Sequence, residues 1–204
     1  RVDRILVLLL TGLLCAVTPV VARPPNIVLI MADDVGFECF GCNGSEHYRT
    51  PRIDQLAAAG MRFTHCYSQP LCTPSRVKLM TGLSNARNYA AFSVLRRDQR
   101  TMGQLMKQGG YATAIAGKWQ LYGAEQYDGR FRAKGTLPRD AGFDHVCLWQ
   151  VDRLGKRYQA PLMYIDGANQ QFGEGDYGPD IATRYLRDFM TKHREESFFA
   201  YYPM

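Results

Sequence analysis

The segment NIVLIMADD, residues 26–34, joins an uninterrupted apolar run to two adjacent carboxylates. The run Asn26–Ala32 has the length of a strand and contains no charged residue, which is typical of a strand buried on both faces of a parallel sheet. We therefore expect this segment to be a central strand, with Asp33 and Asp34 at its carboxyl end.

Helical and apolar patterns alternate after this segment. Thr50-Pro51 predicts a helix start and Gly60 its end. Further helices are expected over Ser75–Met80, Thr101–Gln108 and Pro179–His193, strands over Met61–Tyr67, Tyr111–Ala116, Phe143–Trp149 and Ser197–Tyr202, and a surface loop over Ala124–Asp140. The alternation favours an α/β fold with a largely parallel central sheet flanked by helices.

The composition narrows the class of protein. The chain has 204 residues, of which 46% are hydrophobic and 22% are charged, values that suit a folded globular chain rather than a disordered one. The net charge is +6, but Lys and Arg are scattered and no run of five basic residues occurs. A nucleic-acid partner is therefore not expected.

The N-terminus has the pattern of a secretory signal peptide. A basic start, RVDR, is followed by the apolar run Ile5–Val17 and a small-residue V-x-A site ending at Ala22. We predict a signal peptide over residues 1–22 and export to the periplasm or the extracellular space. The run is too short for a stable membrane span. The chain lacks an initiator Met and ends within an apolar run, so we interpret it as truncated at both ends.

The cysteine count leaves one sulfur unaccounted for. Removal of the predicted signal peptide leaves five cysteines, and an odd number in an exported protein indicates one with another role. Cys39-x-x-Cys42 resembles a redox motif or half of a zinc site, but no second pair completes it. These two are expected to be ordinary or disulfide-bonded cysteines.

Three polar motifs follow predicted strands, at the place where sites collect in open α/β sheets. They are Asp33-Asp34, Cys72 and Gly117–Gln120. The two carboxylates favour a hard cation, calcium or magnesium, and the alternative is a helix N-cap with a solvated neighbour. Arg76 follows Cys72 by one helical turn, which brings its guanidinium beside the cysteine. Lys118 offers a second positive charge for an oxyanion, or is a surface lysine.

The residues around Cys72 resemble a known family. Cys72-Thr73-Pro74-Ser75-Arg76 matches the C-x-P-x-R signature of the sulfatases, within the alkaline-phosphatase-like superfamily. Three further stretches resemble the N-terminal region of that family in the same order: PNIVLIMADDVGFECFGCNG, TPRIDQLAAAGMRFTHCYSQPLCTPSR with LMTG, and YATAIAGKWQL. The resemblance implies that residues 23–204 are the N-terminal part of a sulfatase catalytic domain.

The resemblance also implies a nucleophile. In sulfatases this cysteine is oxidised during export to Cα-formylglycine (3-oxoalanine) by a maturation enzyme that recognises the surrounding residues. One hydroxyl of the hydrated aldehyde attacks the sulfur of a sulfate ester, and the other later expels sulfate, which is covalent catalysis in two steps. Conversion of Cys72 would account for the odd cysteine.

Other roles carry over residue by residue. Asp33, Asp34 and the modified Cys72 would bind the cation, calcium rather than magnesium. Arg76 would hold the formylglycine, and Lys118 would bind it together with a sulfate oxygen. The resemblance thus predicts a calcium-dependent sulfuric ester hydrolase, with a sulfated carbohydrate among the candidate substrates.

The sequence departs from the family in three respects. Gln120 replaces the histidine of the family's G-K-W-H-L-G, and an amide does not take up a proton near neutral pH. Gln120 is then expected to bind substrate or nucleophile by hydrogen bonding, with His65 a candidate substitute base. Leu83 replaces an arginine after LMTG. The family's later Asp-Asn metal pair, lysine and histidine are absent, so this fragment is expected to be inactive alone.

Two other functions stay open at this stage. A phosphodiesterase or phosphonate monoester hydrolase would use the same nucleophile, and a degenerate sulfatase-like binding protein would explain the loss of histidine at Gln120. Activity of the full-length protein on aryl sulfates and aryl phosphate diesters would distinguish all three.

Overall fold

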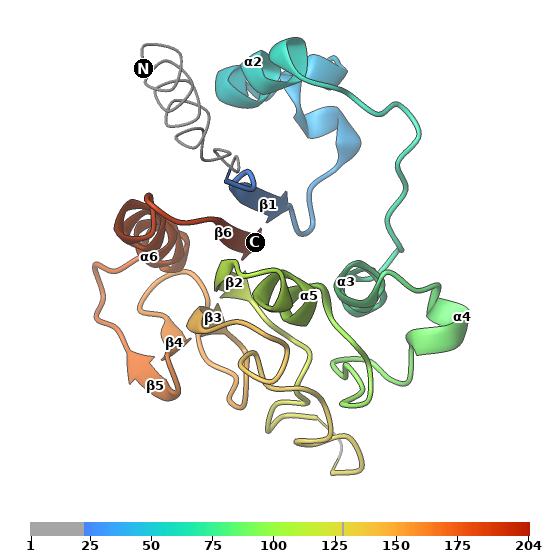
Figure 1. Ribbon diagram of the computed structural model, residues 1–204, viewed down its shortest axis with the longest axis vertical. Helices are drawn as coiled ribbons and strands as arrows, with labels where there is room; N and C mark the ends of the chain where they lie inside the picture. The colour runs from blue at the N-terminus through green and yellow to red at the C-terminus, as the bar shows by residue number, and fades with distance from the viewer. Residues whose placement is uncertain (1–22, 128) are drawn as a thin grey trace, which may run out of the picture.

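The computed structural model describes residues 23–127 and 129–204, and the predicted signal peptide lies outside them (Figure 1). A six-stranded sheet has the order β1-β6-β2-β3-β4-β5. Its strands are β1 (Ile27–Met31), β2 (Ala112–Lys118), β3 (His145–Trp149), β4 (Leu162–Ile165), β5 (Ala168–Gln171) and β6 (Phe198–Pro203). The helices are η1 (Phe37–Cys39), η2 (Gly41–Asn43), α2 (Pro51–Ala59), α3 (Cys72–Thr81), α4 (Asn85–Asn88), α5 (Met102–Gln108) and α6 (Gly178–Lys192).

The predicted α/β fold is confirmed. Strands β1, β6, β2 and β3 run parallel, and β4 and β5 complete the sheet as an antiparallel hairpin. Helix α6 packs on one face of the sheet, and α3 and α5 lie on the other (Figure 1). Two apolar cores result, one on each face, centred on residues such as Ile115 and Phe199 on the α5 side and Ala114 and Phe189 on the α6 side.

Most predicted elements form near their predicted bounds. Helix α5 begins with a capping box in which Thr101 accepts a hydrogen bond from the Gln104 amide and Gln104 accepts one from the Thr101 amide. Helix α3 begins at Cys72, three residues before the predicted start, and ends at Thr81, followed by Gly82, whose φ of 67° gives a left-handed C-cap. The earlier start makes Cys72 part of the first helical turn.

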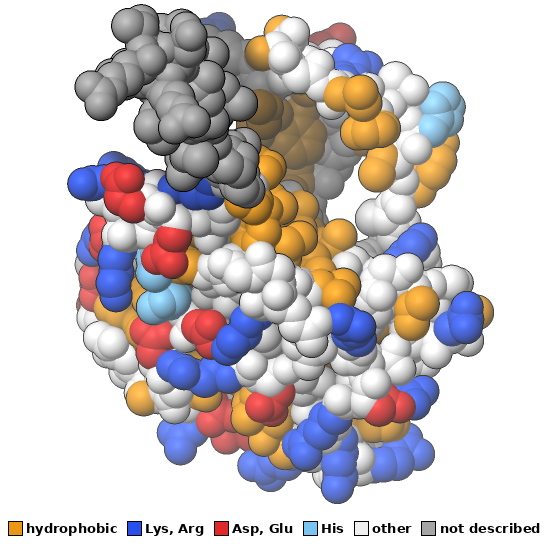
Figure 2. All heavy atoms as spheres, in the orientation of Figure 1, with side chains coloured by type: hydrophobic (Ala, Val, Ile, Leu, Met, Phe, Trp, Pro, Cys, Tyr) orange, Lys and Arg blue, Asp and Glu red, His pale blue; other side chains and the backbone are white. Residues whose placement is uncertain are grey.

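The prediction that the first strand is buried on both faces is wrong for the described chain. β1 lies at the edge of the sheet and pairs only with β6. Because successive side chains of a strand point to opposite faces, Leu29 packs on the core while Val28 and Ile30 stay 50% and 57% exposed. Figure 2 shows apolar side chains gathered on the molecular surface in this region.

Two further predictions need correction. Met61–Tyr67 forms no strand, because no neighbouring strand supplies ladder hydrogen bonds, and Met61 and Tyr67 are 80% and 78% exposed. The segment 124–140 has no helix or strand in its described part, but Ala124 and Thr136 are buried, so it is a surface loop only in part.

The hairpin of β4 and β5 was not predicted. Its turn is Asp166-Gly167, with φ of 48° and 116°. Asp-Gly is the type of turn that suits a two-residue hairpin, so this dipeptide is the signal that could have identified the hairpin.

None of the helices within the described residues is both long and apolar enough to cross a membrane.

Candidate active site

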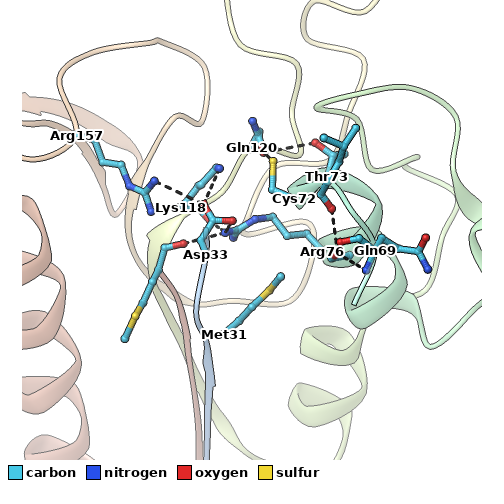
Figure 3. A network of polar contacts seen from close by, with 12 residues as sticks. Met31, Asp33, Gln69, Cys72, Thr73, Arg76, Lys118, Gln120 and Arg157 are labelled. Atoms are coloured by element: carbon cyan, nitrogen blue, oxygen red, sulfur yellow. Dashed lines mark hydrogen bonds and ion pairs between the residues drawn. The ribbon is translucent and has the colours of Figure 1, made fainter. Parts of the chain in front are cut away.

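The predicted site residues lie at the carboxyl edge of the parallel strands (Figure 3). Asp33 follows β1 by two residues, Lys118 ends β2, and helix α3 brings Cys72 and Arg76 to the same edge. Parallel strands place their carboxyl ends together, which explains how residues 85 positions apart in sequence come into contact. The convergence expected from the sequence is therefore present.

Asp33 is the centre of a buried charge cluster. Its Oδ1 lies 3.2 Å from Arg76 Nη2, and its Oδ2 lies 2.8 Å from Lys118 Nζ and 3.5 Å from Arg157 Nη1. Its side chain is only 3% exposed. Burial raises the pKa of the Asp33 carboxyl, but the hydrogen bond from Lys118 and the charges of Arg76 and Lys118 outweigh this and hold the pKa below its ordinary value. Asp33 is thus an ion-pair centre and not a helix cap.

Arg76 joins three parts of the chain. It is 1% exposed, and besides contacting Asp33 its guanidinium donates to the backbone oxygens of Lys118, at 2.7 Å, and Met204, at 2.9 Å. A planar guanidinium carries several donors in a fixed arrangement, which suits this role. Arg76 therefore fixes α3 against the ends of β1, β2 and β6.

Cys72 faces the end of β2 rather than the charge cluster (Figure 3). Its Sγ donates a hydrogen bond to Gln120 Oε1 at 2.8 Å. Thr73 Oγ1 lies 3.4 Å from the same oxygen. The residue that replaces the family's histidine is therefore in direct contact with the predicted nucleophile, as its position in the motif implied.

The turn before Cys72 is closed by Ser75. Its hydroxyl oxygen accepts a hydrogen bond from the Gln69 amide at 3.0 Å, and the hydroxyl donates to the Leu71 carbonyl at 3.0 Å. These contacts hold the chain that enters α3. At the other end of the helix, Leu83 lies next to Asn88, a buried residue whose side-chain amide donates to the Leu83 carbonyl at 2.9 Å.

The described residues offer oxygen ligands of the kind that a hard cation binds, but too few of them to complete its coordination. Asp34 is exposed, follows Asp33 directly in the sequence, and makes no ion pair within the described part of the chain. Calcium takes about six to eight oxygen ligands. Within residues 23–127 and 129–204 no three His, Cys, Asp or Glu side chains converge on a metal position. The described residues therefore do not complete a calcium site by themselves.

Arg157 is a site residue that the sequence did not reveal. Its guanidinium lies 5.2 Å from the ring centroids of both Trp149 and Tyr158, a cation–π arrangement, while it pairs with Asp33. These residues line a cavity of about 200 Å³, together with Tyr202. Arg157 lies in an irregular loop after β3 and belongs to no recognisable motif, so only its place after a strand end could have suggested it.

The remaining predictions about histidine and cysteine side chains differ in outcome. His65 is exposed, and its side chain contacts Thr64 and Tyr67. No contact joins His65 to Cys72 among the described residues, so the structure offers no support for it as a base. The five described cysteines are all free thiols.

Most of the chain is similar to proteins of one family. A family model described as Sulfatase matches residues 25–203. Human Arylsulfatase A is 46% identical over 110 residues, which cover 50% of this chain and 22% of that protein. Mouse Arylsulfatase J is 37% identical over 188 residues, which cover 83% of this chain and 30% of that protein. The chain spans less than a third of these curated relatives.

Solved structures share the fold of this chain. The structure of BT4656 in complex with its substrate D-glucosamine-2-N,6-O-disulfate has a TM-score of 0.73 and 28% identity, and the match covers 89% of this chain and 34% of that one. A phosphonate monoester hydrolase of Agrobacterium radiobacter has a TM-score of 0.64 over 89% of this chain and 40% of that one. At 19% identity this second likeness shows the fold alone.

Proposed function

Because the chain belongs to the sulfatase family, we propose that it is the N-terminal part of an exported enzyme that hydrolyses a sulfate ester. We propose formylglycine, formed from Cys72 by a maturation enzyme, as the nucleophile. The observation that carries this proposal is the placement of Cys72 in the first turn of α3, in contact with Gln120 and one helical turn from the Asp33–Arg76–Lys118 cluster. The neighbour solved with a sulfated glucosamine supports a sulfated carbohydrate as the substrate class.

Each residue has a defined task in this proposal. The modified residue 72 supplies, once hydrated, the hydroxyl that attacks sulfur. Arg76 fixes α3 against the end of β2 through its buried hydrogen bond to the Lys118 carbonyl. Residue 72 is therefore positioned by a packed helix and not by a loop. Lys118 Nζ lies at the carboxyl edge of β2, where it is available to a sulfate oxygen as well as to Asp33. Positive charge fixed in a buried site stabilises the negative charge that develops on the sulfate group during its transfer.

We further propose that Asp33, Asp34 and residue 72 hold a divalent cation, calcium in preference to magnesium. Sulfatases generally use a formylglycine and a divalent cation. The family likeness and two adjacent carboxylate oxygens support this assignment, and the other ligands would come from outside this chain. The cation would supply positive charge at the nucleophile and the sulfate. Since those ligands are missing, we expect this 204-residue piece to be inactive alone.

Mass spectrometry tests the nucleophile directly. In full-length protein produced with a maturation enzyme, the tryptic peptide that contains Cys72 is expected to be about 18 Da lighter than the unmodified peptide, whereas the acids of the cysteine oxidation ladder are all heavier. The same preparation should hydrolyse an aryl sulfate faster than an aryl phosphate diester. An unmodified thiol in active protein would contradict the formylglycine assignment, and a preference for the diester would favour the phosphodiesterase alternative.

The two carboxylates should respond differently to substitution by asparagine. Asp33→Asn is expected to weaken calcium binding and also to destabilise the protein, because Arg76 and Lys118 then lose the buried charge that compensates them. Asp34→Asn should weaken calcium binding with little change in the stability of the metal-free protein. Asp34 is exposed, and asparagine tolerates its left-handed backbone, with φ of 55°.

Isothermal titration with calcium and thermal unfolding in a chelator measure the two effects separately in the full-length protein. The matched control is Asp98→Asn. The Asp98 side chain is exposed and contacts Arg96 and Gln99, which are not part of the charge cluster. Unchanged calcium affinity in both Asp33→Asn and Asp34→Asn would show that the pair is not a cation site.

A further inference from the structure

The same dipeptide, Trp-Gln, lies at the carboxyl ends of β2 and β3, and backbone hydrogen bonds join the two copies. Trp119-Gln120 follows β2, and Trp149-Gln150 spans the end of β3. The Trp119 amide donates to the Trp149 carbonyl at 3.0 Å, and the Gln120 amide donates to the Gln150 carbonyl at 3.1 Å. The two glutamine side chains therefore leave adjacent strands side by side, and both are at least nine-tenths buried.

Both glutamines have a backbone conformation that such residues seldom adopt. The φ angle is 54° at Gln120 and 60° at Gln150. Left-handed φ values are uncommon outside glycine, asparagine and aspartate, and they persist where surrounding contacts over-determine them.

The oxygen of the Gln120 amide faces residue 72. Two donors converge on Oε1, the Cys72 thiol at 2.8 Å and the Thr73 hydroxyl at 3.4 Å. The Thr73 oxygen itself accepts from the Ser93 amide at 3.1 Å, which leaves its proton for Gln120. With two donors on Oε1, the amide nitrogen of Gln120 must point the other way.

Tyr127 occupies the position that this nitrogen faces. Its hydroxyl oxygen lies 3.4 Å from Gln120 Nε2 and 2.8 Å from Gln150 Nε2, and a hydroxyl has two lone pairs to accept both donors. The Tyr127 ring packs edge-on against Phe92, with 5.9 Å between the ring centroids. One hydroxyl thus accepts from the amides at the ends of two neighbouring strands.

We propose that Tyr127 and Gln150 are positioning residues that lock the Gln120 amide with its carbonyl oxygen toward residue 72. The catalytic effect of this lock rests on the proposed function. At a hydrated formylglycine, the locked oxygen accepts a hydrogen bond from one hydroxyl and so orients the oxygen lone pairs of the nucleophile. Gln120 takes no proton in this role, and the proton leaves to water or to another group.

A thiol-labelling experiment tests the lock without sulfatase activity. Full-length protein made without the maturation enzyme keeps Cys72 as a thiol, and its rate of alkylation by iodoacetamide at fixed pH is followed peptide by peptide. In the wild type the Gln120 oxygen accepts a hydrogen bond from the Cys72 thiol. Tyr127→Phe frees the amide to turn and donate N–H to the thiolate, so we expect roughly fivefold faster alkylation of Cys72, the value of one hydrogen bond.

A double-mutant cycle separates this effect from a simple opening of the site. In a Gln120→Leu background no amide remains to turn, so adding Tyr127→Phe should leave the alkylation rate of Cys72 unchanged. Tyr111→Phe, the same change at the opposite end of β2, should also have no effect. An unchanged rate in Tyr127→Phe, or an equal acceleration in the Gln120→Leu background, would overturn the proposal.

Kinetics of the matured protein provide the second measurement. Tyr127→Phe is expected to lower kcat about fivefold with KM unchanged, because it disturbs the orientation of the nucleophile and not the binding of substrate. A rise in KM at constant kcat would instead assign Tyr127 to substrate binding and contradict the lock. If the matured wild type hydrolyses no sulfate ester, the proposed function fails, while the labelling cycle still decides the amide orientation.

Discussion

Replacing Cys72 by alanine in the full-length protein is expected to remove sulfate-ester hydrolysis, with a fall in turnover on the order of 10⁴-fold or more. A methyl group is neither oxidised to an aldehyde by the maturation enzyme nor able to attack sulfur. The substitution removes little else, because within the described residues the Cys72 side chain makes one hydrogen bond, to Gln120. The loss should therefore reflect chemistry and not unfolding.

The matched control is Cys66→Ala, which removes an exposed free thiol six residues earlier in the same segment. Turnover of an aryl sulfate and the midpoint of thermal unfolding should both match those of the wild type in this variant. In Cys72→Ala only the unfolding midpoint should match. Retention of more than about a hundredth of the activity by Cys72→Ala would place the nucleophile elsewhere.

Part of this site can be predicted from the sequence, from helical periodicity and from the rule that parallel strands place their carboxyl ends at one edge of the sheet. The spacing of Cys72 and Arg76 predicted one helical turn, and α3 provides it. The Arg76 guanidinium contacts Asp33 and the carbonyls of Lys118 and Met204, however, and not Cys72 within the described residues, so its expected place beside the cysteine is not confirmed. Asp33 and Lys118 each follow an apolar run, and the shared carboxyl edge of parallel strands brings them to 2.8 Å from each other. Both inferences need only local regularity and a parallel sheet.

The contacts that the sequence does not predict come from irregular backbone. Arg157 and Tyr127 lie on loops without regular secondary structure, so no sequence periodicity marks them. Each contacts site residues that belong to other segments of the chain. The expected strand at Met61–Tyr67 fails for the converse reason. Its apolar residues suit a strand, but a strand also needs a neighbour to complete its hydrogen bonds, and the local sequence does not determine the neighbour.

Gln120→His, which restores the residue usual in the family, is expected to lower turnover of the full-length enzyme roughly tenfold, the value of about one hydrogen bond. The Gln120 amide presents an acceptor to residue 72 and a donor to Tyr127 at the same time. An imidazole is shorter and carries its two nitrogens in a rigid ring, so it is not expected to reproduce both contacts. Gln170→His, on the exposed strand β5, is the control for the substitution itself.

The opposite result is equally well defined. If Gln120 marks a site that has lost its base, the wild type should be slow in a proton-transfer step, and histidine should restore general-base catalysis, which contributes about 10²- to 10⁴-fold. Single-turnover kinetics on the matured wild type and Gln120→His separate the two cases. We expect the tenfold decrease because all four residues are present, with Arg76 and Lys118 paired to Asp33 and Cys72 bonded to Gln120, and a decaying site would be expected to lose several of these together. An increase of about a hundredfold or more would instead show that Gln120 replaced a working base.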